Sequence, residues 1–380
     1  MIKKLNDVVF LFLFCGIVCL IGCNNILSEN SNETRSLSNH FKNHFHIGAA
    51  INENTILGND NKSKEIVVSE FNSITPENSL KWMFIQPLPG KFDFKVSDKY
   101  VNIGSKNGMY TVGHALIWHA QLAEFMQNIN KDETLFHVKN HINTLMNRYK
   151  GKIDAWDVVN EAFEEDGSFR ESVFYKNLGK NYIEDVFVLA AKVDPEVDLI
   201  YNDYNLYKSE KRLAVINMVN KFKANGTKID GVGVQAHWDL NTPSINEIEN
   251  IILDFHETGI LVSFTELDIS VLPNPWEMIG AEVNQNFSKF EGDPKMNPYP
   301  NGLPNNIQDK LAKRYEDIFK LFLKHSDKIN RVTFWGVIDK YSWLNDWPIK
   351  GRTNYPLLFD KDYKSKKAYY KLLELKTNQN

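Results

Sequence analysis

Strand-like runs alternate with helical segments along most of the chain, and this alternation restricts the fold more than any other feature. Eight runs have the composition of buried strands: 46–51, 71–76, 110–118, 153–160, 197–203, 230–238, 261–269 and 330–338. The segments between them place apolar residues at three- and four-residue spacing, as in 132–149, 209–226 and 244–259. Alternating strands and helices predict a parallel sheet, and eight such units predict an α/β fold closed into a (β/α)8 TIM barrel.

The alternative fold is a doubly wound open sheet. Such folds bind ligands at one crevice, and many carry a glycine-rich phosphate-binding turn after the first strand. Here no Gly-x-Gly-x-x-Gly stretch follows the run 46–51, and polar residues end many of the strands rather than flank one crevice. The pattern therefore favours the barrel.

The first residues predict an export signal. Lys3 and Lys4 precede an apolar run over 8–21, which is too short to span a membrane comfortably. The run ends in Leu-Ile-Gly-Cys at 20–23, which resembles the lipobox of bacterial lipoproteins, in which the cysteine carries the lipid. The alternative is an ordinary signal peptide in which Cys23 is incidental.

This pattern sets the expected domain boundaries. Residues 1–22 are the expected signal peptide, and 23–40 are the lipidated Cys23 followed by a tether, because the segment is rich in Asn and Ser and poor in large apolar residues. The catalytic body is expected over 41–376, with a tail at 377–380. We therefore expect an exported protein that is lipid-anchored to a bacterial membrane, on its periplasmic or cell-surface face.

Charge and cysteine content exclude several classes of function. The formal net charge is −4 and the sequence pI is about 6.2, so no basic surplus is available to neutralise nucleic acid. Cys15 and Cys19 lie within the expected signal peptide, which leaves only Cys23. The mature chain would then contain no disulfide, no cysteine metal site and no cysteine nucleophile. We expect a monomer without a metal or an organic cofactor.

Barrel enzymes place their active sites at the carboxyl ends of the strands, where this chain carries polar residues. Glu161 ends the fourth run and Glu266 lies near the end of the seventh, so both are expected to face one cavity. Paired carboxylates suit the cleavage of glycosidic bonds, in which one is protonated and the other ionised. Two such glutamates alone could equally hold a metal or pair with lysines.

Residue spacing adds further candidates. Gln235 and His237 are two positions apart, as are Glu266 and Asp268, so each pair is expected to share one strand face. A histidine between two carboxylates could orient one of them and influence its charge. The simpler alternative for His237 is a buried barrel histidine without a catalytic role.

Two other chemistries are disfavoured by the sequence. His114 and His119 are five positions apart, which places them on opposite faces of a strand, and the helical His-Glu-x-x-His metal motif is absent. A serine hydrolase is disfavoured because no Gly-x-Ser-x-Gly elbow occurs.

Aromatic residues also gather at the predicted strand ends. Trp82, Trp118, Trp335 and Trp343 lie at or just after these ends. Indole rings stack on the C–H faces of sugars, and side chains such as Asn78, Lys81 and Gln235 offer fixed hydrogen-bonding groups to sugar hydroxyls. Although each tryptophan alone could serve packing, together they favour a carbohydrate-binding cleft.

Seven stretches in one order resemble glycoside hydrolase family 10, the retaining endo-β-1,4-xylanases. They are FNSITPENSLKW (71–82), VGHALIWH (112–119), WDVVNEAF (156–163), YNDYN (201–205), GVGVQAHW (231–238), FTELDI (264–269) and FWGVIDKYSW (334–343), followed by PLLFD (356–360). The resemblance implies hydrolysis of internal bonds in xylan or xylo-oligosaccharides by double displacement through a glycosyl-enzyme intermediate.

The resemblance also implies roles for individual residues. Glu161 would be the acid/base and Glu266 the nucleophile; Asn160 would bind the sugar 2-hydroxyl; His237 and Asp268 would keep Glu266 ionised. The residues expected to bind substrate are Glu77, Asn78, Lys81, His114, Trp118, Gln235, Trp335 and Trp343. The two carboxyl groups would lie roughly 5 to 5.5 Å apart, as in retaining enzymes.

Two segments depart from what the family implies. AQLAEFM (120–126) replaces a stretch in which members commonly have a proline and a tryptophan, so contacts there are expected to differ. The segment 271–306 contains six prolines and is expected to cap one end of the cleft. The alternatives to a xylanase are the same mechanism on another β-1,4-glucan and a non-catalytic xylan-binding lipoprotein, against which the presence of both glutamates argues.

Overall fold

The computed structural model describes residues 36–275 and 283–377, and residues 35–380 form one compact unit. The expected signal peptide, Cys23 and most of the expected tether lie outside the described residues. Among the residues that the structure does describe, no helix is both long enough and apolar enough to cross a membrane.

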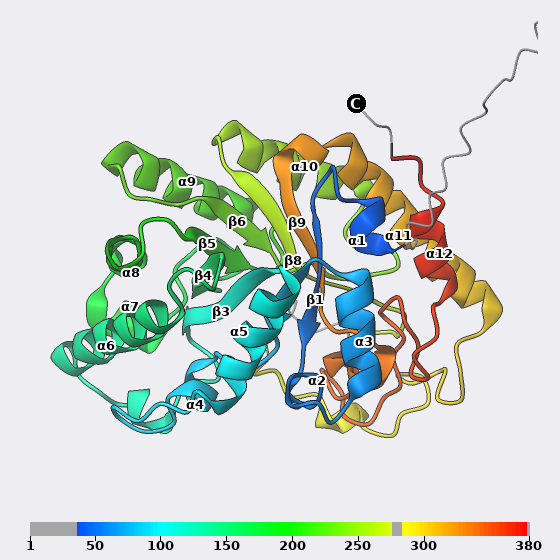
Figure 1. The fold of residues 1–380 in the computed structure, drawn as a ribbon, viewed down its shortest axis with the longest axis horizontal. Coiled ribbons are helices and arrows are strands. Elements are labelled where there is room, and N and C mark those ends of the chain that lie inside the picture. The colour runs from blue at the N-terminus through cyan, green and yellow to red at the C-terminus, as the bar shows by residue number, and fades with distance from the viewer. Residues whose placement is uncertain (1–35, 276–282, 378–380) are drawn as a thin grey trace, which may run out of the picture. The chain divides into compact units, whose positions relative to one another are not determined.

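The strands form one closed parallel barrel (Figure 1). β1 pairs with both β2 and β9, and β6 pairs with β8, so eight strands complete a ring; the short β7 pairs only with β8. The strands are β1 (His46–Ile51), β2 (Ser73–Pro76), β3 (Tyr110–Trp118), β4 (Ala155–Asn160), β5 (Asp198–Asp203), β6 (Gly231–Val234), β7 (His237–Asp239), β8 (Leu261–Ser270) and β9 (Ile329–Phe334). The predicted (β/α)8 barrel is confirmed.

Helices connect the strands and cover the outside of the barrel. They are α1 (Leu37–His40), α2 (Glu53–Leu57), α3 (Asn61–Glu70), α4 (Trp82–Ile85), α5 (Lys95–Asn107), α6 (Lys131–Tyr149), α7 (Val173–Leu178), α8 (Tyr182–Val193), α9 (Ser209–Asn225), α10 (Ile245–Glu257), α11 (Asn305–Lys324) and α12 (Lys367–Leu373). Ser244 and Glu247 form the capping box that starts α10. Short 3-10 turns include Asp339–Tyr341 and Trp343–Asn345 in the segment after β9.

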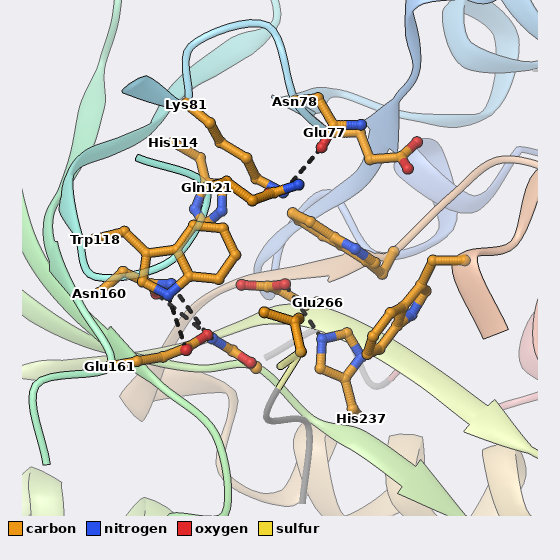
Figure 2. Close-up of a pocket in the computed structure, with 14 residues that line it drawn as sticks. Glu77, Asn78, Lys81, His114, Trp118, Gln121, Asn160, Glu161, His237 and Glu266 are labelled. Carbon is orange, nitrogen blue, oxygen red and sulfur yellow. Dashed lines mark hydrogen bonds and ion pairs between the residues drawn. The ribbon is translucent and has the colours of Figure 1, made fainter. Parts of the chain in front are cut away.

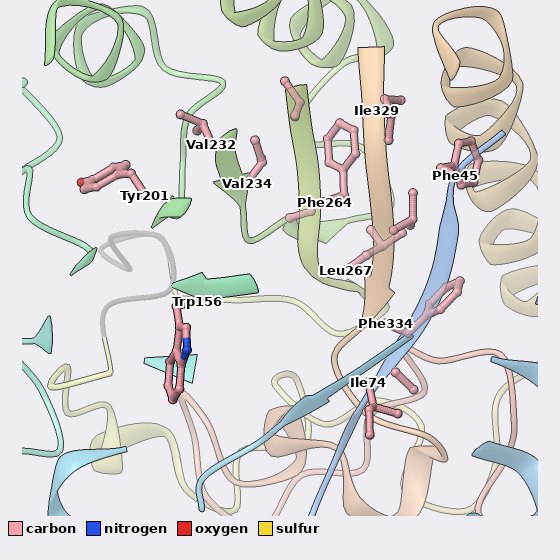
Figure 3. Close-up of a cluster of buried hydrophobic side chains, with 14 of the residues drawn as sticks. Phe45, Ile74, Trp156, Tyr201, Val232, Val234, Phe264, Leu267, Ile329 and Phe334 are labelled. Atoms are coloured by element: carbon pink, nitrogen blue, oxygen red, sulfur yellow. The ribbon is translucent and has the colours of Figure 1, made fainter. Parts of the chain in front are cut away.

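Apolar side chains between the strands and the helices form the main core (Figure 3). Phe264 on β8 stacks on Phe322 of α11 with ring centroids 4.1 Å apart, and Phe334 on β9 lies parallel to Phe319 of the same helix at 6.0 Å. Such packing fixes each strand against its helix, because close-packed interiors allow little movement. The carboxyl ends of the strands, where the predicted site lies, are therefore held on a rigid frame.

Two predicted strands end earlier than the sequence suggested. The run 230–238 breaks after Val234, and Ala236 has a left-handed backbone with φ of 65°. The run 330–338 ends at Phe334, and Gly336 has φ of 135°. Gln235 and His237 thus do not share one continuous strand as predicted; the irregular backbone between β6 and β7 directs them instead.

The folded body begins before residue 40, where the expected tether was to end. Ser36 caps α1 through its side chain, and Leu37 and Phe41 are fully buried. The backbone N–H of Leu37 donates to Glu70 Oε2 at 3.0 Å, and Tyr369 of α12 reaches the same carboxylate at 3.1 Å. These contacts place residues 36–40 in the folded body and not in the tether. The sequence did not indicate this, because Leu37 has polar neighbours although its own side chain fills an apolar site.

Candidate active site

A pocket with a volume of about 250 Å³ opens at the carboxyl ends of the barrel strands (Figure 2). Every residue predicted to bind substrate lines this pocket, together with four of the five predicted catalytic residues: Glu77, Asn78, Lys81, His114, Trp118, Asn160, Glu161, Gln235, His237, Glu266, Trp335 and Trp343. Asp268 does not line it and lies behind His237. The barrel thus brings together residues from six distant stretches of sequence.

Glu161 follows β4 directly and projects into the pocket with a left-handed backbone, φ 57°. Its carboxylate accepts hydrogen bonds from Trp118 Nε1 at 2.8 Å, Gln235 Nε2 at 2.8 Å and Asn160 Nδ2 at 3.1 Å. Burial nevertheless raises the pKa of Glu161 above its ordinary value. This carboxyl group is suited to hold a proton and donate it.

Glu266 lies on β8 and has a different environment. Its Oε1 accepts from Asn202 Nδ2 at 2.8 Å, and its Oε2 lies 3.2 Å from His237 Nε2. Burial alone would raise the pKa of Glu266, but the hydrogen bond from His237 and the electrostatic effect of the nearby imidazoles of His114 and His237 hold it below its ordinary value. The group is suited to remain ionised.

His237 is held between two carboxylates, as the sequence predicted. Its Nδ1 lies 3.0 Å from Asp268 Oδ1 as an ion pair, and Trp343 Nε1 donates to the other oxygen of Asp268 at 2.8 Å. Burial by itself would lower the pKa of His237, but the charge of Asp268, reinforced by Glu266, raises it to about 10. A protonated His237 therefore faces Glu266 at neutral pH.

Asn202 at the end of β5 links the two glutamates. Its Nδ2 donates to Glu266 and also to Asn160 Oδ1, each at 2.8 Å, and Asn160 donates in turn to Glu161. Thr265 Oγ1 donates to Asn202 Oδ1 at 2.6 Å and fixes the amide orientation. Sequence reasoning placed Asn202 at a strand end within YNDYN but assigned it no role.

The opposite wall carries groups suited to sugar hydroxyls. Lys81 Nζ donates to Asn78 Oδ1 at 3.0 Å and lies 5.0 Å from the centroid of the Trp118 ring. Burial lowers the pKa of Lys81, while the nearby charges of Glu266, Glu77 and Glu161 oppose this shift. Burial likewise raises the pKa of Glu77.

His114 on β3 is positioned from within the barrel. Its Nδ1 lies 2.9 Å from Asp157 Oδ2, and both side chains are buried. The other oxygen of Asp157 lies 3.7 Å from Arg331 on β9. Because Nδ1 is engaged by Asp157, His114 can offer only Nε2 to other groups at the pocket.

Two further hollows adjoin the central pocket. One has a volume of about 640 Å³ and shares Glu77, Asn78 and Trp343 with it. The other has a volume of about 130 Å³, shares His237 with it and is lined by residues after β5 and β7, among them Asn205, Tyr207 and Trp238. Together the three hollows form a cleft across the barrel mouth.

We find no group of three or more His, Cys, Asp or Glu side chains arranged to hold a metal ion within residues 36–275 and 283–377. The acidic groups of the pocket engage amide, indole and imidazole partners instead, as described above for Glu161 and Glu266.

The family model for glycosyl hydrolase family 10 matches residues 36–375. The chain belongs to glycosyl hydrolase family 10. The predicted family is thereby confirmed, and the matched range begins at Ser36, the first residue that the structure describes. Family 10 membership also agrees with the closed barrel and with the position of both glutamates at its carboxyl face.

Two relatives with similar sequences are named as xylanases. The chain is 39% identical over 338 residues to endo-1,4-beta-xylanase A of Xylanibacter ruminicola, covering 87% of this chain and 91% of the relative. It is 39% identical over 344 residues to a beta-1,4-xylanase of Dictyoglomus thermophilum, covering 90% and 91%. Among solved structures, a family 10 endoxylanase retrieved from a sugarcane soil metagenome matches with a TM-score of 0.84 and 44% identity, covering 90% of this chain and 99% of that one.

Some features of the family 10 site escaped the sequence analysis. Gln121 and Val283 line the pocket but were not predicted. Gln121 lies in the divergent stretch 120–126 with φ of 47°, a conformation that sequence does not reveal for a non-glycine residue. Val283 belongs to the proline-rich segment 271–306; residues 276–282 of that segment lie outside the described residues, so its capping of the cleft stays a prediction.

Trp82 was predicted to lie with three other tryptophans at the cleft, and this prediction is wrong. Its side chain is 3% exposed, and its ring stacks on His141 of α6 with centroids 3.8 Å apart. It does not line the central pocket, in contrast to Trp118, Trp335 and Trp343. The reason is that α4 begins at Trp82 and turns this side chain inward against α6.

Proposed function

We propose that this protein is a retaining endo-β-1,4-xylanase that hydrolyses internal bonds of xylan and xylo-oligosaccharides. The observation that carries the proposal is the opposite environment of the two pocket carboxylates: the pKa of Glu161 is raised and that of Glu266 is lowered. Pairs of carboxyl groups with separated pKa values are the equipment of glycoside hydrolysis. The names of the family 10 relatives supply the substrate class.

In the first step, Glu266 attacks the anomeric carbon of the bound sugar. A bond forms between its carboxylate oxygen and that carbon, the glycosidic bond breaks, and Glu161 gives its proton to the leaving oxygen. In the second step, Glu161 removes a proton from water, the water oxygen bonds to the anomeric carbon, and Glu266 leaves. Two displacements at one carbon give net retention.

Neighbouring groups support these steps. His237, held by Asp268, would keep Glu266 ionised before attack. Asn160, which donates to Glu161 and is linked to Glu266 through Asn202, would bind the 2-hydroxyl of the sugar. The remaining subsite residues around Lys81 and Trp118 would hold the other hydroxyls and ring faces. The hollows that adjoin the central pocket support cleavage within a chain, since they leave room for sugar units beyond the one held at the two glutamates.

We also propose that the protein is exported and lipid-anchored through Cys23, as a monomer. The support is the basic start, the short apolar run and the Leu-Ile-Gly-Cys stretch. Expression in a bacterial host with radiolabelled palmitate tests this: label should enter the protein and be lost in Cys23→Ala. Label in neither form would contradict the anchor.

The function itself is tested by product analysis. The purified chain is incubated separately with xylan and with a soluble cellulose derivative, and products are resolved over time. Short xylo-oligosaccharides that appear early from xylan are expected. Products from the cellulose derivative alone would point to a glucanase, and binding of xylan without any product would contradict an enzyme.

A further inference from the structure

The peptide group between Glu161 and Ala162 is held on both sides by side chains that do not line the central pocket. Glu161 has a left-handed backbone with φ of 57°, which non-glycine residues rarely adopt and which persists only where the surroundings fix it. The carbonyl oxygen of this peptide accepts a hydrogen bond from Arg170 Nε at 3.1 Å. Its N–H, on Ala162, donates to Tyr201 Oη at 3.0 Å. The direction in which the Glu161 side chain leaves the backbone therefore depends on these two contacts.

Tyr201 is itself fixed by a buried ion pair. Its Oη donates to Asp203 Oδ2 at 2.5 Å, and Asp203 Oδ1 lies 2.8 Å from Lys211 Nζ. Asp203 is the last residue of β5, Lys211 lies in the first turn of α9, and both side chains are fully buried. Because the hydroxyl hydrogen of Tyr201 is directed to Asp203, its oxygen keeps a lone pair for the N–H of Ala162.

The contact on the carbonyl side leads back to the same lysine. Arg170 Nη2 donates to Tyr204 Oη at 2.7 Å, and Lys211 Nζ lies 3.6 Å from the centroid of the buried Tyr204 ring. A cation is attracted to an aromatic face, most strongly where both are shielded from water. The backbone N–H of Arg170 also donates to Ala162 O at 2.8 Å, which ties Arg170 to the turn that it holds. Lys211 therefore joins the two sides.

Stability alone gives little reason for a lysine at this buried position. Removal of both charges from water costs free energy that offsets their attraction, so a buried ion pair is a weak source of net stability. Lys211 has a second acidic partner in Glu165, whose Oε1 lies 3.4 Å from Nζ, and Glu165 is shared with the more exposed Lys208. Burial raises the pKa of Glu161, and the negative charge of Asp203 acts in the same direction. The ion pair thus acts on Glu161 through its field as well as through Tyr201.

We propose that Lys211 is a positioning residue for the proton donor: through Asp203 and Tyr204 it fixes the peptide that follows Glu161. The inference rests on the proposed function, which makes Glu161 the acid/base. Proton transfer requires hydrogen-bond distance, and a small rotation of this peptide would move the carboxyl group away from the leaving oxygen. Lys211 lines none of the three hollows described above, so it acts on the reaction through other residues.

The test separates proton donation from the rest of catalysis by the choice of leaving group. kcat/KM reports the first displacement and is measured for phenyl β-xylobioside, whose phenolate leaves poorly without a proton, and for 2,4-dinitrophenyl β-xylobioside, whose phenolate leaves without one. The full-length variants are Tyr201→Phe, Tyr204→Phe and Lys211→Met. Tyr149→Phe is the matched control, because the Tyr149 hydroxyl on α6 donates to Asp98 Oδ1 on α5 at 3.0 Å, outside the barrel. Thermal unfolding establishes that each variant is folded.

The wild type should cleave both substrates. Tyr201→Phe and Tyr204→Phe should each lower kcat/KM for the phenyl substrate about tenfold and change that for the dinitrophenyl substrate by less than about twofold, since only the phenyl substrate needs the positioned proton. Lys211→Met should show the same selective loss, and the two tyrosine variants decide the question if Lys211→Met does not fold. Tyr149→Phe should leave both values unchanged.

A merely structural role for these residues would lower both values together. Equal losses on the two substrates, or a wild-type ratio of the two values in either folded tyrosine variant, would overturn the positioning role of Lys211 while the xylanase function stands. Failure of the wild type to cleave either substrate would instead overturn the proposed function, and the positioning role with it.

Discussion

Glu161 and Glu266 stand at the two ends of one chain of side-chain hydrogen bonds. The chain passes through Asn160 and Asn202, with donor–acceptor distances of 3.1, 2.8 and 2.8 Å. Buried networks of this kind hold their members in one arrangement, because an unpaired amide in the interior costs free energy. The proposed proton donor and the proposed nucleophile are thus positioned by common partners.

We predict that Asn202→Ala lowers kcat by about 10- to 100-fold, the value of one hydrogen bond to a charged group. Loss of the donated hydrogen bond should also raise the pKa of Glu266, so the acidic limb of the pH–rate profile should move to higher pH. Steady-state kinetics from pH 4 to pH 9 measures both. An unchanged acidic limb would show that Asn202 does not act on Glu266.

Glu266→Ala should abolish turnover of xylan without unfolding the protein. Added azide should restore cleavage of an aryl β-xylobioside and give the α-glycosyl azide, because the small anion fills the place of the missing carboxylate and attacks once. Glu161→Ala is the matched variant and should give the β-glycosyl azide, since Glu266 still reacts first. The same azide anomer from both variants would contradict the assigned roles.

Trp118→Phe should shift the alkaline limb of the kcat/KM profile to higher pH. The indole N–H stabilises the ionised form of Glu161, and its removal leaves burial to raise the pKa of this group further. The protonated form of Glu161, which is required for proton donation, then persists to higher pH. A limb that moves to lower pH would contradict this account of Glu161.

The His237–Asp268 ion pair should make stability depend on pH. The pKa of His237 is about 10 in the folded protein against an ordinary value of 6.5, so its contribution is fully present below pH 6.5 and is lost as the pH rises toward 10. Asp268→Asn should be destabilised relative to the wild type at pH 6.5, and the difference should narrow by pH 10. Urea unfolding at these pH values checks this, and a difference that widens with pH would contradict it.

Asp157→Asn should weaken the orientation of His114 and lower kcat/KM on xylo-oligosaccharides. Asp157 lies in the barrel interior and engages Nδ1 of His114 at 2.9 Å, so the substitution alters a pocket residue without touching the substrate. Steady-state kinetics measures the loss in kcat/KM, and thermal unfolding shows whether the variant is still folded. A loss of orientation is thereby distinguished from a loss of stability. Full activity in a folded variant would show that His114 does not depend on Asp157.

Much of the barrel was predictable from local pattern. β1 and β3 have the predicted bounds, because each is a continuous buried run between clear turn signals. The break after Val234 was not predictable, since it depends on the left-handed backbone of Ala236, which alanine rarely adopts. The burial of Leu37 depends on α3 and α12, which are distant in the sequence.

Site residues that belong to a recognisable motif could be predicted from the sequence. Contacts between residues on different strands could not. Glu161 and Glu266 stood out as carboxylates at strand ends, and the barrel explains why they meet. The bridge through Asn202 arises from the register of β4 against β5, which pairs Asn160 with Asn202 and is invisible in the sequence. Trp82 has the same residue type as the pocket tryptophans, and only its stacking on His141 distinguishes it.

Double displacement on xylan by Glu266 and Glu161 retains the configuration at the anomeric carbon. Proton NMR of the anomeric signals during hydrolysis of xylohexaose by the full-length protein measures this configuration. New reducing ends should appear first as the β-anomer and then equilibrate to the α-anomer. Initial appearance of the α-anomer would show inversion, and no new anomeric signal would show that the chain is not a xylanase.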